Sequence, residues 1–165
     1  MTERPTWDQF FLQMARHYAG RSRDESTKCG AVIVNGARGV VSGGYNGTAR
    51  GSTADVTKMS REERLQRTAH SETNALYNAN FHGISTRGCS IFVVTLDPEY
   101  GLPCGGCATA IVNSGIAECV VAHTRFPARW AKDAEIMVEV FREGGVILRR
   151  ADSTTCLRYM GDLDG

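Results

Sequence analysis

Two short segments of the chain carry the residue types that bind metals and move protons. One is His70-Ser71-Glu72, and the other is the run from Pro103 to Cys107, "PCGGC". Imidazole nitrogen and cysteine sulfur are ligands that zinc prefers, and His70, Cys104 and Cys107 would supply three of them. Three protein ligands leave a fourth position open, which is typical of a catalytic zinc site rather than a structural one.

Glu72 gains a role from its place two residues past His70. A water bound to zinc ionises near neutral pH and can attack an electrophilic carbon. Glu72 is close enough to such a water to take its proton without being a metal ligand. We therefore expect Glu72 to be the catalytic residue that receives this proton and returns it elsewhere.

Each segment has a simpler interpretation when it is taken alone. A His-x-Glu pair at a helix start is usually exposed and contributes to capping. A Cys-x-x-Cys pair also occurs in redox sites and as half of a four-cysteine structural zinc site. The chain has no second Cys-x-x-Cys. Together, the two segments match the H-x-E…P-C-x-x-C signature of zinc-dependent nucleobase deaminases.

Both segments fall where a helix is expected to begin. Apolar residues at helical spacing predict helices, and apolar runs rich in β-branched residues predict strands. The predicted helices cover residues 5–20, 61–67, 71–81, 104–115 and 128–145, with a loop over 48–60. The predicted strands cover residues 31–34 and 39–45, which form a hairpin, and 89–96, 117–123 and 146–150.

This order of elements predicts one α/β domain over residues 1–150. A hairpin followed by alternating helices and strands gives a mixed sheet with helices on its faces. We expect a three-layer α/β/α sandwich with about five strands. Residues 151–165 show no clear period and are predicted to form a C-terminal tail that is either mobile or part of a subunit contact.

Composition narrows the class of protein. The chain has 165 residues, of which 42% are hydrophobic and 22% charged, as in a soluble globular domain. It has no apolar run long enough to cross a membrane, and its first residues lack a signal-peptide core, so a cytoplasmic location is expected. A net charge of +1 argues against a duplex nucleic-acid binder. The lack of a basic, aromatic strand-binding surface also counts against a nucleic-acid editor.

From about Trp7 to Arg149 the chain resembles the deoxycytidylate (dCMP) deaminases of the cytidine deaminase-like superfamily. The resemblance rests on the zinc signature and on four segments: "RSRDESTKCGAVIV", "GYNG", "HSETNAL" and "TL…PCGGC". It implies a cytidine deaminase-like fold with Zn²⁺ as cofactor. It also implies hydrolysis of dCMP to dUMP and ammonia.

The resemblance assigns roles to individual residues. His70, Cys104 and Cys107 would bind zinc, and Glu72 would protonate the pyrimidine ring at N3. The backbone N–H of Ser71 would contact the pyrimidine O2.

The resemblance also implies that Asn46 binds the sugar or the base. Asn46 has a simpler interpretation as a turn residue, since Asn-Gly is a common turn pair.

The 5′-phosphate of a nucleotide needs cations, and Arg21, Arg23 and Lys28 lie together before the first strand. Arg23 is our first choice from the "RSRD" match, and an ordinary solvated basic turn is the alternative. Family members are often hexamers that dCTP activates and dTTP inhibits. The resemblance therefore implies a homo-oligomer, a hexamer or a dimer, with dCTP and dTTP as effectors near the loop after Asn46.

Two departures from the family pattern affect the substrate. Ser71 replaces the usual alanine, which leaves its backbone role intact. Residues 97–102 are an added segment directly before the zinc cysteines, and it would place Tyr100 over the base or alter a subunit contact. Alternative substrates are therefore dCTP, a 5-substituted dCMP, cytidine and a purine. A non-catalytic nucleotide-binding or structural zinc protein is the alternative of another class, but such a protein would not need Glu72.

Overall fold

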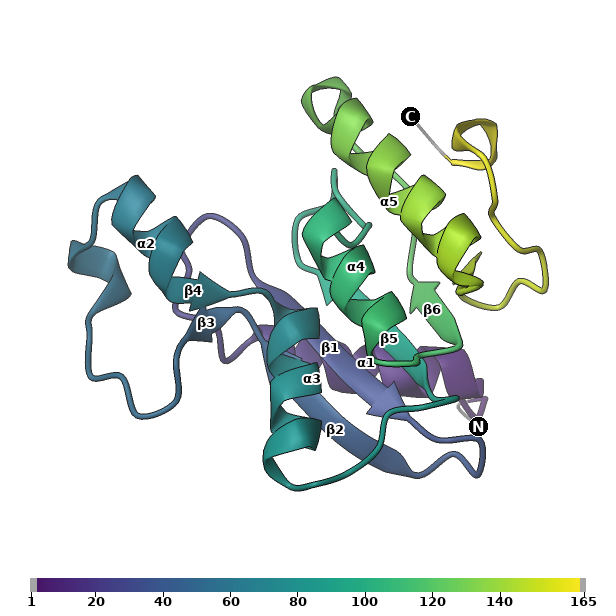
Figure 1. The fold of residues 1–165 in the computed structure, drawn as a ribbon, viewed down its shortest axis with the longest axis horizontal. Coiled ribbons are helices and arrows are strands. Elements are labelled where there is room, and N and C mark those ends of the chain that lie inside the picture. The colour runs from purple at the N-terminus through teal and green to yellow at the C-terminus, as the bar shows by residue number, and fades with distance from the viewer. Residues whose placement is uncertain (1–2, 164–165) are drawn as a thin grey trace.

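A five-stranded mixed sheet forms the centre of the protein (Figure 1). The structure is a computed structural model, and it describes residues 3–163. The strand order is β2-β1-β5-β6-β7. β1 is antiparallel to β2 and β5, whereas β5, β6 and β7 are parallel to one another. These strands are β1 (Cys29–Val34), β2 (Val40–Tyr45), β5 (Ser90–Thr95), β6 (Glu118–Val121) and β7 (Ile147–Arg150).

Helices cover both faces of this sheet (Figure 1). On one face lies α1 (Trp7–Ala19), which begins at a capping box between Thr6 and Gln9. On the other face lie α3 (Ser71–Phe81), α4 (Gly105–Asn113) and α5 (Ala131–Gly144). The predicted three-layer α/β/α sandwich with five strands is confirmed.

Each layer boundary is filled by its own apolar cluster, because successive strand residues point to opposite faces. The cluster under α1 includes Phe11, Ala15, Val32, Phe92 and Val120. The larger cluster, under α3, α4 and α5, includes Ala75, Ile91, Ala108, Ile111 and Met137. The two helices that begin at the predicted metal ligands, α3 and α4, therefore both stand on the larger cluster.

Residues 49–67 form an arm that extends to one side of the sheet (Figure 1). A short antiparallel pair, β3 (Gly47–Thr48) with β4 (Thr68–Ala69), closes the base of this arm. The arm contains a 3₁₀ turn, η1 (Val56–Lys58), and the helix α2 (Arg61–Arg67). The short helix was predicted from the sequence, whereas the β3–β4 pair was not. The base of the arm leads directly into His70.

The described part of the C-terminal segment packs on its own domain. The Leu157 N–H donates a hydrogen bond to the Leu148 carbonyl oxygen (2.8 Å), and Leu163 is buried in the larger cluster. A subunit contact of this segment stays a prediction. Residues 1–2 and 164–165, which belong to the predicted domain and tail, lie outside the described residues. Within residues 3–163, no helix is both long enough and apolar enough to span a bilayer.

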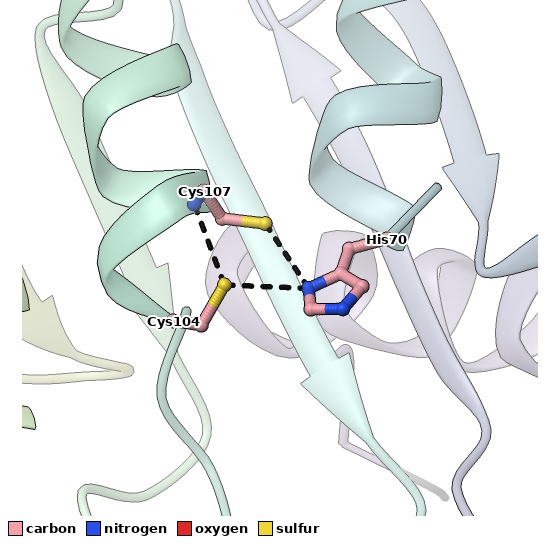
Figure 2. Close-up of side chains that lie close together, drawn as sticks. All are labelled: His70, Cys104 and Cys107. Carbon is pink, nitrogen blue, oxygen red and sulfur yellow. Dashed lines mark hydrogen bonds between the residues drawn. The ribbon is translucent and has the colours of Figure 1, made fainter. Parts of the chain in front are cut away.

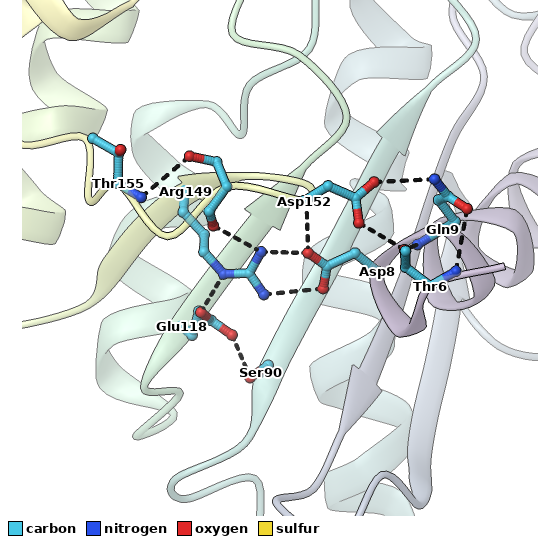
Figure 3. Close-up of polar contacts among 9 residues, drawn as sticks. Thr6, Asp8, Gln9, Ser90, Glu118, Arg149, Asp152 and Thr155 are labelled. Atoms are coloured by element: carbon cyan, nitrogen blue, oxygen red, sulfur yellow. Dashed lines mark hydrogen bonds and ion pairs between the residues drawn. The ribbon is translucent and has the colours of Figure 1, made fainter.

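An ion-pair network joins the first helix to the last strands (Figure 3). The Arg149 guanidinium donates hydrogen bonds to both carboxylate oxygens of Asp8, and its Nε donates to Glu118 (2.6 Å). Asp152 accepts hydrogen bonds from the side chains of Thr6 (2.6 Å) and Gln9 (3.2 Å). This network ties the N-terminal part of the domain to residues more than 140 positions later, since Asp8 and Arg149 are 141 residues apart.

Candidate metal centre and active site

The three predicted metal ligands come together at the starts of two helices that face each other (Figure 2). His70 is the N-cap residue of α3, and Cys104 is the N-cap residue of α4. Cys107 follows in the first turn of α4, so the two sulfurs lie on one side of that helix. Within residues 3–163, these side chains form the one group of three or more such ligands close enough to share an ion, with all ligand atoms within 4.8 Å of one another.

The distances fit a tetrahedral zinc site. His70 Nδ1 lies 3.3 Å from Cys104 Sγ and 3.4 Å from Cys107 Sγ. Ordinary Zn–N and Zn–S bond lengths place two such ligands about 3.6 Å apart in a tetrahedron. One imidazole and two thiolates are also a donor set that zinc prefers. The three side chains therefore fit this ion in chemistry and in spacing.

The protein environment favours the form of Cys104 that binds a metal. The hydrogen bond with Cys107 is the largest effect, and with the His70 ring and the Cys107 N–H it lowers the pKa of Cys104 to about 4. The contact with Cys104 in turn raises the pKa of His70 to about 9. The hydrogen bond between the two sulfurs raises the pKa of Cys107. These contacts favour a thiolate at Cys104, and metal binding would release the remaining protons.

Glu72 lies in the first turn of α3, two residues past the histidine ligand, and is only 4% exposed. Burial raises the pKa of its carboxyl group, while the nearby His70 partly offsets that rise. The Ser71 hydroxyl, which is also buried, donates a hydrogen bond to Glu72 Oε2 (2.9 Å). This carboxyl group is therefore held in place and has a higher affinity for a proton than an exposed one.

Contacts with β2 fix α3, and with it His70 and Glu72. A Cβ atom on Gly44 would lie only 2.3 Å from the backbone nitrogen of Ala75, so the helix approaches the strand as closely as glycine allows. Asn74 Nδ2 donates to the Tyr45 carbonyl oxygen (2.8 Å), and Asn78 Nδ2 donates to that of Gly43 (2.8 Å). The "GYNG" and "HSETNAL" segments noted in the sequence are thus two sides of one interface.

Asn46 directly follows β2, and both the oxygen and the nitrogen of its side-chain amide are engaged. Its Oδ1 accepts a hydrogen bond from the Cys29 N–H (2.8 Å), and its Nδ2 donates to the Thr27 carbonyl oxygen (2.8 Å). These bonds secure the entry to β1, which gives Asn46 a structural role. One N–H and one lone pair of the amide remain, so a contact with a ligand stays a prediction.

Arg23 is exposed and lines an open cleft of about 870 Å³ between the arm and α3. Asn46 and Ala69 also line this cleft, and Ala69 precedes His70. The metal ligands and Glu72 are not part of its wall, so the cleft lies beside the metal centre rather than over it. Its wall is basic, with Arg21, Arg23, Arg50, Arg64 and Arg67.

Tyr100 is half-buried in the segment of residues 97–102, just before the zinc cysteines. Its ring lies 5.8 Å from that of Trp130, and it packs on the larger apolar cluster. Burial raises the pKa of the Tyr100 hydroxyl, and the nearby charges of Asp133 and Cys104 add to the rise. The side chain is thus within electrostatic reach of the metal centre, while its contact with a base stays a prediction.

Two residues near the centre were not anticipated from the sequence. The Thr73 hydroxyl lies 3.7 Å from Cys107 Sγ, and the Asp133 carboxylate accepts a hydrogen bond from the Gly105 N–H (3.2 Å). Thr73 lies on the predicted helix three residues past His70, so helical spacing could have indicated it. Asp133 has only its place near the start of the last helix as a signal.

The chain is similar in sequence to proteins named as deaminases. The family model described as the cytidine and deoxycytidylate deaminase zinc-binding region matches residues 5–123. An "uncharacterized deaminase" from the luxG 3′ region of Aliivibrio fischeri is 32% identical over 142 residues, 85% of this chain and 90% of that protein. Deoxycytidylate deaminase of Homo sapiens is 31% identical over 150 residues, 87% of this chain and 79% of that protein.

The fold is also similar to a solved structure. The dCMP deaminase of cyanophage S-TIM5, crystallised in complex with dCMP and dUMP, superposes with a TM-score of 0.67 at 18% sequence identity. The superposition covers 90% of this chain and 99% of that one. At this identity the similarity establishes the shared architecture.

Proposed function

This chain belongs to the cytidine and deoxycytidylate deaminase zinc-binding family, and we propose that its reaction is the hydrolysis of dCMP to dUMP and ammonia. The observation that carries the proposal is a three-ligand zinc site with a buried glutamate, Glu72, two residues past the histidine ligand. The choice of dCMP is supported by the deoxycytidylate deaminase of Homo sapiens, at 31% identity.

In this proposal Glu72 carries the protons. Zinc held by His70, Cys104 and Cys107 would lower the pKa of water and so supply a hydroxide nucleophile at neutral pH. The Glu72 carboxylate would accept the proton that water gives up and deliver it to ring N3 as hydroxide adds to C4. A second proton transfer from the new hydroxyl group to the amino group would then let ammonia leave as the C4 carbonyl forms. The raised pKa of Glu72 suits a group that both accepts and donates a proton near neutral pH.

The other predicted residues would hold the nucleotide. The Ser71 N–H is at the start of α3, where backbone N–H groups lack partners within the helix, and it would donate to the pyrimidine O2. Asn46 would donate its remaining N–H to the sugar or base. Arg23, in the wall of the adjoining cleft, would bind the 5′-phosphate. Tyr100 would contact the base from the added segment.

Residues 97–102 are the reason for testing substrates other than dCMP. Pro103 alone separates this segment from Cys104, and Leu102 anchors the segment in the larger cluster. A substrate site with a different wall at this point would accept dCTP, a 5-substituted dCMP, cytidine or a purine, and the zinc chemistry would stay the same. A non-catalytic zinc protein is less well supported, because the Glu72 carboxylate bonds to the Ser71 hydroxyl rather than to a metal ligand and so is not needed to hold the ion.

Oligomerisation, regulation and location belong to the same proposal. We expect a homo-oligomer, a hexamer or a dimer, and regulation by dCTP and dTTP. The five arginines of the cleft would suit such anionic effectors. A cytoplasmic location is consistent with six cysteines that form no disulfide, because zinc requires reduced thiolates at Cys104 and Cys107.

A substrate panel tests the function. Zinc-loaded protein is incubated with dCMP, dCTP, deoxycytidine, cytidine, 5-methyl-dCMP and dAMP, each with and without dCTP as activator. Ammonia release is measured, and the product is identified by chromatography. Preferential turnover of dCMP to dUMP is the expected result. Faster turnover of another compound would overturn dCMP as the substrate, and no turnover of any would overturn the proposed reaction.

A further inference from the structure

A carboxylate from the last helix reaches the turn that carries both cysteine ligands. Asp133 lies in the first turn of α5, and its Oδ1 accepts a hydrogen bond from the Gly105 N–H (3.2 Å). Gly105 directly follows Cys104 and stands two residues before Cys107. The hydrogen bond therefore acts on the peptide between the two sulfur ligands.

The close packing of α4 and α5 fixes this contact. A Cβ atom on Gly105 would lie 2.9 Å from Ile136 Cγ2 and 3.4 Å from Asp133 Oδ1, so the helices meet where the side chain is smallest. Ala108 and Ile111 of α4 share one buried cluster with residues of α5, among them Ala134 and Met137. A carboxylate one residue before such a buried position has little freedom to move away.

The contact also means that two N–H groups at the start of α4 have different acceptors. The first N–H groups of a helix have no partner within it. Here the Cys107 N–H donates to Cys104 Sγ (3.4 Å), while the Gly105 N–H donates to Asp133. With Gly105 held by α5, the turn is kept in the orientation that directs the Cys107 N–H at the Cys104 sulfur.

The Asp133 carboxylate meets the Gly105 N–H through one of its two oxygens. Asp133 Oδ2 is buried and has no hydrogen-bond partner among residues 3–163. Leaving a buried carboxylate oxygen without a partner is unfavourable. The hydrogen bond from the Gly105 N–H is therefore the contact through which Asp133 acts on the metal centre.

We propose that Asp133 is a positioning residue for the zinc centre: its hydrogen bond to the Gly105 N–H holds the cysteine turn so that both sulfurs meet one ion together with His70. The proposal rests on the zinc site and on no particular substrate. Asp133 lies beyond residues 5–123, which the family model covers, so the last helix adds this support from outside the matched region.

Zinc affinity of three variants tests the role. The Asp133→Ala variant removes the acceptor, whereas Asp133→Asn keeps an oxygen at Oδ1 and removes the charge. The Glu135→Ala variant is a matched control on the same helix, since Glu135 is exposed and pairs with Lys132. Affinity is measured on the full chain by competition with a chromophoric chelator, without nucleotide. The visible spectrum of the Co²⁺-substituted protein reports the thiolate ligands.

We expect Asp133→Ala to weaken zinc binding about 10- to 100-fold and to alter the thiolate-to-cobalt absorption. Asp133→Asn should recover most of this loss together with the spectrum, and Glu135→Ala should match the unmodified protein. Unchanged zinc affinity in Asp133→Ala, or an Asp133→Asn variant as weak as Asp133→Ala, would overturn the positioning role. Because no substrate is present, an error in the assignment of dCMP would leave these results unaffected.

Discussion

At the scale of single residues, the Ser71 hydroxyl distinguishes this active site from one with alanine at the same place. It donates to the carboxylate proposed to carry protons (2.9 Å). We predict that Ser71→Ala lowers kcat about fivefold with little change in KM, because about 1 kcal/mol of Glu72 positioning is lost. Ser90→Ala removes a similar hydroxyl–carboxylate bond, to Glu118 on the sheet (2.8 Å), and should leave kcat unchanged. Equal kcat values for Ser71→Ala and the unmodified protein would contradict the prediction.

A substitution of Arg23 tests the proposed phosphate site separately from the zinc chemistry. We predict that Arg23→Ala raises KM for dCMP about tenfold and leaves KM for deoxycytidine nearly unchanged, since only dCMP carries the anion. Arg61→Ala is a suitable control, because Arg61 is an exposed arginine of α2 outside the cleft wall. Steady-state kinetics on both substrates give the comparison. An equal rise in KM for both would remove Arg23 from the phosphate site.

Sequence spacing identified the zinc ligands because helix geometry determines their separation. Cys104 and Cys107 are three residues apart, and a helical turn brings residues at that distance together. Glu72 follows His70 so closely that only the helix start was needed to place them side by side. The contact of Asp133 could not be predicted from the sequence, because its partner, Gly105, is 28 residues away and is brought near only by helix packing.

At the scale of elements, the contact of α3 with β2 positions His70 and Glu72. We predict that Gly44→Ala lowers the free energy of unfolding by about 1–3 kcal/mol, because the added methyl group forces the helix outward. Zinc affinity should fall as well, since α3 begins at a metal ligand. Urea denaturation and a zinc titration measure the two effects. Gly36→Ala is the control, since a Cβ atom there would meet nothing within 4 Å; unchanged stability of Gly44→Ala would contradict the account.

The longer helices and strands were predicted from the sequence, while the shortest strands were not. The five predicted helices and five strands of the sheet are all present, because each is long enough to show a period or an apolar run. The β3–β4 pair has two residues on each strand, too few for any alternation to be visible. The position of the arm beside α3, which creates the basic cleft, also depends on this pair.

At the scale of the whole molecule, the Arg149 network joins the two ends of the domain. Arg149 lowers the pKa of Asp8 below its ordinary value of 3.8. Because the folded-state pKa is depressed, the stabilisation is fully present above pH 3.8 and is lost as the pH falls through the folded-state value. Most of the network is shielded, since the Asp8 and Arg149 side chains are 15% and 17% exposed.

Asp8→Asn should therefore lower the free energy of unfolding by about 2 kcal/mol at pH 7. The difference from the unmodified protein should shrink once the pH falls below 3.8. Urea denaturation at several pH values measures both. Glu135→Gln breaks an exposed pair and should change stability by less than about 0.5 kcal/mol. A difference that persists undiminished at pH 2.5 would show that the Asp8 charge is not responsible.

The net charge of the molecule does not show where its charged side chains are concentrated. The net charge of +1 argued against a duplex nucleic-acid binder, yet five arginines line one cleft in the folded chain. Three of them, Arg50, Arg64 and Arg67, come from the arm or its helix, and the other two precede β1. Only the folded chain brings these separate segments to one surface.

The central claim is that Glu72 carries protons beside a zinc held by His70, Cys104 and Cys107. The most direct test is the rate of dUMP formation from dCMP by zinc-loaded Glu72→Gln, compared with the unmodified protein at equal zinc content. We predict that the variant binds zinc and folds normally while kcat falls about 10²- to 10⁴-fold. A zinc-loaded Glu72→Gln protein with undiminished turnover would contradict the account.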